Sequence, residues 1–237
     1  MATRMKVLQA AAGNLSEPVD ITDVFSTYLF DGSAGNQSIT NGIDLAGEGG
    51  MVWVKARTQD NNYIFDTERG REVLITNDTA SSNVLEDSTK DLLTFDSNGF
   101  SIGPAWETNF NSSGTPNVSW TFRKAEKFFD VVTYTGDGST TKTVSHNLGV
   151  TPAFIIFKRT DSTGNWVTWH KDTLLGTYTQ SYLRLNGSFP ITSLGDYGNS
   201  LVPTSTFIRT PVHSNAVNTP DSVNVSGGTY VAYLFAS

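Results

Sequence analysis

A group of aromatic and histidine side chains in the second half of the sequence is best suited to chemistry with a ligand. Trp169 is followed by the polar residues His170 and Lys171, so its indole suits an exposed platform on which a sugar ring stacks. Further aromatic residues flank nearby segments that look like inserted loops, and loops often carry binding function. We therefore predict a glycan contact formed by Trp169, His170, Tyr178, Tyr182 and Tyr197.

The alternative for these tryptophans is purely structural. Aromatic side chains supply much of the buried area of a β-sandwich, so an indole on a strand is first a candidate for the core. We expect this role for Trp53 and Trp120, which lie in runs rich in β-branched residues. For Trp169 both roles stay open at this stage.

Catalysis has little support in the sequence. Pairs of acids such as Asp66 with Glu68 are candidates for a glycosidase, but close acids in turn-rich segments are more typical of a solvated face. The three histidines are not at metal-ligand spacing, and the chain has no HExxH motif, no phosphate loop and no cysteine. We expect no enzymatic activity, no cofactor and no metal. A calcium site remains an open alternative, with oxygen ligands from Asp161, Asp172 or Asp196.

Composition points to an all-β protein outside the nucleic-acid-binding class. Charged residues make up only 16% of the 237 residues, Gly is frequent and aromatics reach 11%. The net charge of −7 comes from residues 23–127, which hold 15 acids and 8 bases, whereas residues 128–237 hold 6 of each. An acidic or neutral chain without a basic cluster argues against nucleic-acid binding. No apolar run is long enough for membrane insertion.

A repeated ending organises the chain into two units. Asn111–Phe122 (NSSGTPNVSWTF) and Asn224–Phe235 (NVSGGTYVAYLF) share Asn, Ser-Gly, Val, an aromatic residue and a closing Phe. Short β-branched and aromatic runs separated by Gly and Asn turns precede each ending, which is typical of antiparallel sheets. We predict an all-β fold of two tandem antiparallel β-sandwich (jelly-roll-like) domains, spanning residues 23–127 and 128–237, joined rigidly by the short linker RKAEK.

An N-terminal arm, residues 1–22, precedes the two domains. Its apolar residues have no obvious domain of their own, so we expect the arm to anchor the protein on a neighbouring subunit through Met5, Val7 and Leu8. The alternative is a disordered leader.

Several runs together resemble a known family. They are DVFSTYLFDGS, ITNGIDLAGEGGMVWVKAR, FDSNGFSIG, SWTFRKAEKFFDVVTYTGDGS, HNLGVTPAFIIFKRTD and VNVSGGTYVAYLFAS. They are similar to tandem modules in tail-fibre and other tail-associated virion proteins of tailed, often marine, bacteriophages. The resemblance implies a concanavalin-A-type or SPRY-like β-sandwich, and it supplies no catalytic residues.

The resemblance leads to an expected role as a non-enzymatic virion structural protein, tail- or fibre-associated, that contributes to attachment to the host surface. It implies assembly in the cytoplasm of a host bacterium, other virion proteins of the tail or capsid as partners, and a homo-oligomer such as a trimer or ring. A host-surface glycan is the expected ligand. The alternative is a head decoration or collar protein with a purely stabilising role.

Overall fold

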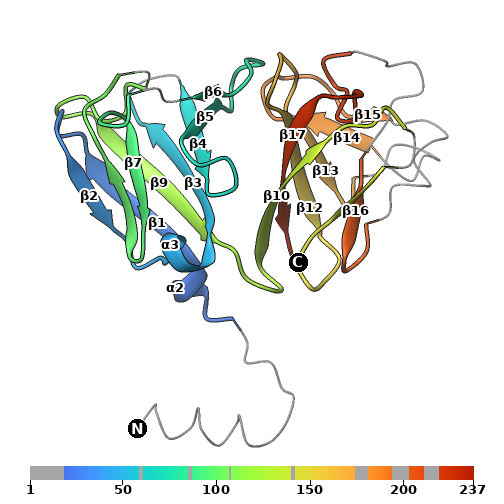
Figure 1. Cartoon of the computed structure of the whole chain (residues 1–237), viewed down its shortest axis with the longest axis horizontal. Helices are drawn as coiled ribbons and strands as arrows, with labels where there is room; N and C mark the ends of the chain where they lie inside the picture. The colour runs from blue at the N-terminus through green and yellow to red at the C-terminus, as the bar shows by residue number, and fades with distance from the viewer. Residues whose placement is uncertain are drawn as a thin grey trace, which may run out of the picture.

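The computed structural model describes residues 19–58, 61–84, 87–106, 108–139, 142–173, 181–193, 203–210 and 219–237. It shows two sandwich-like halves side by side, each built of antiparallel strands (Figure 1). The all-β prediction is confirmed. No helix within the described ranges is long and apolar enough to cross a membrane. The predicted arm residues Met5, Val7 and Leu8 lie outside the described residues.

The first half consists of a large sheet and a small one. The large sheet has the order β1-β9-β3-β4-β5-β6 and the small sheet the order β2-β8-β7. Two helices of one turn, α2 (Ile21–Val24) and α3 (Leu45–Glu48), accompany them. The strands are β1 (Phe25–Asp31), β2 (Gln37–Thr40), β3 (Gly50–Ala56), β4 (Asn62–Asp66), β5 (Glu72–Ile75), β6 (Asn83–Val84), β7 (Leu92–Asp96), β8 (Gly99–Ile102) and β9 (Pro116–Arg123).

The second half repeats this order. Its large sheet runs β10-β17-β12-β13-β14-β15, and β11 pairs with β16 in a small sheet. The strands are β10 (Phe129–Thr135), β11 (Thr143–Ser145), β12 (Phe154–Arg159), β13 (Val167–His170), β14 (Ser181–Arg184), β15 (Thr192–Ser193), β16 (Phe207–Arg209) and β17 (Thr229–Phe235).

The repeated endings of the sequence are β9 and β17, which lie at the same place in the two large sheets, next to the edge strand. The register is also repeated, because Trp53 opposes Trp120 in the first sheet and Ile156 opposes Tyr233 in the second. Strand by strand, a residue of one half therefore has a defined counterpart in the other.

Asn111 and its counterpart Asn224 stabilise equivalent loops in the two halves through hydrogen bonds to the backbone. The amide of Asn111 accepts from Ser33 N and donates to Gly35 O, both at 2.9 Å. In the second half the Asn224 amide accepts from Asp137 N at 3.0 Å. Gly32 packs so closely on the Asn111 loop that a Cβ would lie 2.2 Å from Ser112 O. A buried side-chain amide replaces backbone partners that the turning chain cannot supply.

Each half has its own core between its large and small sheets. In the first half the core contains alternate residues of β3, Val52 and Val54, together with Phe65, Phe100 and Phe110. The core of the second half contains the counterparts from β12, β13 and β17. Because the other face of each large sheet is also apolar, Met51 on the outer face is buried like Val52 and Val54 on the inner face, and Trp53 is partly buried.

Candidate binding groove between the two halves

The two halves pack against each other through the outer faces of their large sheets. Met51 on β3, Ile64 on β4 and Leu74 on β5 are fully buried in this contact. Packed sheets of this kind interdigitate their side chains much as a sandwich core does. The first half thus shares one apolar cluster with residues of the second, namely Phe129, Val131, Ile156, Trp166, Val231 and Tyr233.

A buried ion pair of the first half is hydrogen-bonded across the junction to the second half. The Arg69 guanidinium contacts Asp66 Oδ2 through Nη2 at 2.6 Å and through Nε at 2.7 Å. The Tyr233 hydroxyl of the other half donates to the same Asp66 oxygen at 2.8 Å and accepts from Arg69 Nη2 at 3.2 Å. Burial disfavours the charged guanidinium, but Tyr233 and Asp66 outweigh it and raise the pKa of Arg69; burial raises the pKa of Tyr233. This network stabilises one relative position of the halves.

A second set of hydrogen bonds ties the end of β5 and the segment after it to the second half. The Lys158 ammonium donates to Gly164 O at 2.6 Å and to Thr79 O of the first half at 2.9 Å. The Trp166 indole N–H donates to Ile75 O at 3.0 Å. Burial lowers the pKa of Lys158 to about 8. The short linker and these contacts together support the predicted rigid arrangement of the halves.

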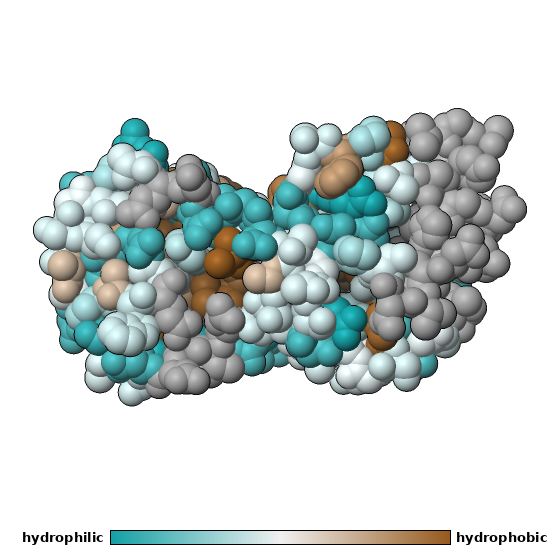
Figure 2. Space-filling model, turned by 90° about the horizontal axis from the view of Figure 1, so that it is seen from above, coloured by the Kyte–Doolittle hydropathy of each residue, from teal (hydrophilic) through white to brown (hydrophobic). Residues whose placement is uncertain are grey.

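A groove of about 360 Å³ lies at this junction. In the space-filling view the molecule narrows between the halves, and hydrophobic surface is exposed beside this waist (Figure 2). The volume falls at the lower end of the range for small-molecule sites, which combine an apolar wall with a few polar groups. The groove is lined by Trp53, Asn62, Thr76, Asn77, Trp120, Phe122 and Leu185.

Two tryptophans on neighbouring strands form its wall. The rings of Trp53 and Trp120 lie edge to face, with centroids 6.1 Å apart and an interplanar angle of 71°. Both side chains are half-buried, so each contributes indole surface to the groove. The expected placement of these two residues in a sandwich core is wrong, because their register directs them to the outer face of the sheet and away from the small sheet.

The polar end of the groove is held by side-chain amides. Asn77 Oδ1 accepts from the backbone N–H of Asn62 at 3.0 Å, and Asn77 Nδ2 donates to Asn61 Oδ1 at 3.2 Å. Amides of this kind offer donors and acceptors in fixed positions. None of the described lining residues carries an ionisable side chain.

The groove exists because the two sheets are covered unequally. Tyr233 and Ile156 are the counterparts of Trp120 and Trp53, and both are buried against the first half, at 0% and 2% exposure. On the first half, β3, β4 and β5 receive this contact, and Trp120 on β9 stays partly open. Leu185, which follows β14, closes the groove from the second half.

The described residues of the predicted glycan contact, Trp169, His170 and Tyr182, do not form one exposed platform. Trp169 is only 9% exposed and packs in the core of the second half, because it opposes Ile155 on the inner face of β12. The prediction that Trp169 is exposed is wrong, and the alternative, a place in the sandwich core, is confirmed. His170, one residue further, lies on the outer face with 45% of its side chain exposed. Tyr178 and Tyr197 lie outside the described residues.

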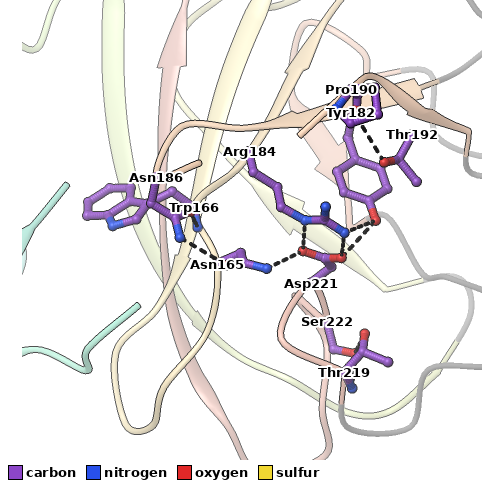
Figure 3. A network of polar contacts seen from close by, with 10 residues as sticks. All are labelled: Asn165, Trp166, Tyr182, Arg184, Asn186, Pro190, Thr192, Thr219, Asp221 and Ser222. Atoms are coloured by element: carbon purple, nitrogen blue, oxygen red, sulfur yellow. Dashed lines mark hydrogen bonds and ion pairs between the residues drawn. The ribbon is translucent and has the colours of Figure 1, made fainter. Parts of the chain in front are cut away.

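Tyr182 belongs to a polar network that closes the second half (Figure 3). Its hydroxyl donates to Asp221 Oδ2 at 2.9 Å, and burial with this carboxylate raises its pKa to about 12. Arg184 binds both oxygens of the same carboxylate, and Asn165 Nδ2 donates to Oδ1 at 2.7 Å. Because the ring of Tyr182 is 3% exposed, this residue has a structural role in the described fold.

The other described residues that the sequence suggested for catalysis or metal binding form contacts within the fold. Asp66 is the buried partner of Arg69, so it does not form a catalytic pair with Glu68. Asp161 pairs with Arg159 at 2.8 Å. The ring of His146 lies near Thr204 O at 3.2 Å, and burial lowers its pKa. Within the described part of the chain, no three His, Cys, Asp or Glu residues are grouped to hold a metal.

Sequence reasoning missed the groove because it assigned Trp53 and Trp120 to the core. One available signal was the alignment of the two repeats, in which Trp120 aligns with Tyr233 and Trp53 aligns with Ile156. The two aligned residues are large aromatic side chains that each carry a polar N–H or O–H group. That choice suits a face which meets either another domain or a ligand.

Residues 20–237 match a family described as a domain of unknown function, DUF7483. The chain belongs to this family. A search of curated proteins and a search of solved structures found no match. The DUF7483 match begins beside α2 and ends at the last residue of β17's tail, so both halves and the groove between them fall within one family domain. The unit of the family is therefore the pair of halves.

Proposed function

We propose that this DUF7483 protein is a non-enzymatic structural protein of a bacteriophage virion, associated with the tail or a fibre, which binds host-surface glycans through the junction groove. The observation that carries the proposal is the Trp53–Trp120 wall beside the amides of Asn62 and Asn77. Indole faces pack against the C–H surface of a sugar ring, and amides hydrogen-bond its hydroxyl groups.

The virion context of the proposal rests on the resemblance of the sequence to phage tail modules. The rigid junction fits that context, since a surface protein transmits force only if its parts keep a fixed relation. The predicted assembly partners, other virion proteins and further copies of the chain bound through residues 1–22, belong to this proposal.

A glycan array tests it. Wild-type protein is expected to bind a defined set of glycans, and Trp120→Ala is expected to lose about tenfold or more in affinity. Trp106→Ala is the matched control, because Trp106 is 68% exposed and does not line the groove. If folded wild-type protein binds no glycan, the attachment role fails and the head decoration or collar role gains support. Antibody labelling of intact particles then locates the protein.

A further inference from the structure

A second cleft lies at the junction, on the side of the edge strand β10. Its volume is about 440 Å³, and polar side chains of both halves line it. The groove described above meets the second half at Leu185 after β14, which is separated from β10 by three strands in the sheet. The two sites therefore share no lining residue. The cleft is lined by Glu68, Arg69, Glu72, Thr133, Tyr134, Thr135, Thr160, Thr229 and Tyr230.

Arg69 contributes a buried donor to this cleft. Its side chain is 4% exposed, and its Nε and Nη2 atoms are engaged by Asp66 and Tyr233. Its Nη1 atom has no hydrogen-bond partner among the described residues and forms only a long ion pair, at 3.9 Å, with Glu72 Oε2. Because a buried donor without an acceptor is unfavourable, an acceptor that reaches both Nη1 and Glu72 is favoured.

Acceptors and hydroxyl groups surround this donor. Glu68 accepts from Lys124 Nζ at 2.7 Å and Glu72 from Ser82 Oγ at 2.9 Å. Each carboxylate has further lone pairs that accept additional donors. The hydroxyl groups of Thr133 and Thr135 stand on the exposed outer face of β10. The cleft thus combines a donor at its floor with acceptors and hydroxyl groups on its walls.

These groups select a ligand that both donates and accepts. An anion accepts from Arg69 but meets the like charges of Glu68 and Glu72. A cation suits the two carboxylates but is repelled by Arg69. A hydroxyl group accepts from Arg69 Nη1 and donates to Glu72 at the same time. We propose that this cleft is a second carbohydrate site, which binds neutral sugars through hydroxyl groups and acts independently of the aromatic groove.

Saturation-transfer NMR with free glucose, galactose, mannose and inositol tests the proposal. At least one of these probes is expected to receive saturation from the wild-type protein. Thr135→Tyr fills the cleft from an exposed strand position and is expected to reduce the signal by about tenfold. Thr143→Tyr, on the exposed face of β11, is the matched control and is expected to keep it.

Glu72→Gln is a second variant with a distinct effect. It keeps the shape of the wall and the acceptor for Ser82 but removes the charge, so a hydroxyl ligand is expected to bind several-fold more weakly. In a Trp120→Ala background, which disables the aromatic groove, Thr135→Tyr is still expected to reduce the remaining signal by about tenfold. This separates the second site from the proposed function.

Three results overturn the second site. One is the absence of saturation transfer to any of the four probes from folded wild-type protein. Another is a signal that disappears with Trp120→Ala and persists with Thr135→Tyr. The last is competition, in which phosphate or spermidine displaces the sugar at comparable concentration, because the cleft then recognises charge.

Discussion

The Trp53–Trp120 pair of the first half and the Ile156–Tyr233 pair of the second occupy the same positions in two sheets of the same order. The first pair is half-buried and lines a groove, whereas the second is buried and fastens the halves together. Position within the sheet therefore does not decide the role of these residues. The neighbour that covers each outer face decides it.

This difference shows how a repeated sandwich can leave one of two matched sheet faces partly open. On the outer face of the second sheet, the hydroxyl group of Tyr233 is buried against Asp66 and Arg69. The outer face of the first sheet is covered over β3 to β5, and the wall at β9 stays open to a ligand. Substitutions at matched positions of the two halves separate fastening from binding.

The largest contrast is expected between Asp66 and its counterpart His170, which oppose Met51 and Phe154 in the same register. Asp66→Asn leaves the buried Arg69 charge without a carboxylate and is expected to lower the free energy of unfolding by about 3–5 kcal/mol. His170→Asn changes an exposed side chain and is expected to stay within about 0.5 kcal/mol. Denaturant unfolding of both variants measures the contrast, and equal effects would contradict it.

A smaller contrast is expected between Tyr233 and Trp120. Tyr233→Phe removes one hydroxyl that contacts both Asp66 and Arg69, which is expected to cost about 1–3 kcal/mol of stability. Trp120→Phe, in the partly open wall, is expected to cost less than about 1 kcal/mol while weakening glycan binding. Thermal and denaturant unfolding compare the two, with binding to the array as the second readout. A Trp120→Phe protein less stable than Tyr233→Phe contradicts the assignment of the two faces.

A third contrast concerns the dependence of stability on pH. Burial holds the pKa of Lys158 at about 8, below its ordinary value of 10.5. Between these values the unfolded chain binds more protons than the folded one, so stability is expected to rise with pH, by at most about 1.4 kcal/mol per pH unit. Lys158→Met is expected to abolish this rise. Lys55→Met, at the matching position of β3, is expected to keep it because Lys158 is retained. Unfolding measured from pH 7 to 10.5 shows which profile each protein follows.

The sequence predicted the fold well and the site poorly, for a physical reason. Asn111 and Asn224 mark equivalent loops, and the alternation in β9 and β17 marks strands, because turn chemistry and side-chain period are local properties. Which face of a sheet meets which neighbour is not local. Both faces of β3 are apolar, so its sequence does not distinguish the inner position of Val52 from the outer position of Trp53.

Trp169 illustrates the same limit from the other side. Its polar neighbours suggested exposure, but strand register places it inside and His170 outside. The cleft at Arg69 was equally hidden, since its lining comes from four separate segments that only the junction brings together.

The most direct test uses the five tryptophans as reporters. In a ¹⁵N-labelled sample each indole N–H gives its own NMR signal, which is assigned through single substitutions. On titration with the glycan that binds most strongly on the array, the Trp53 and Trp120 signals are expected to shift together. Those of Trp106, Trp166 and Trp169 are expected to stay in place. Shifts at Trp169 or Trp106, with Trp53 and Trp120 unaffected, would contradict the junction groove as the binding site.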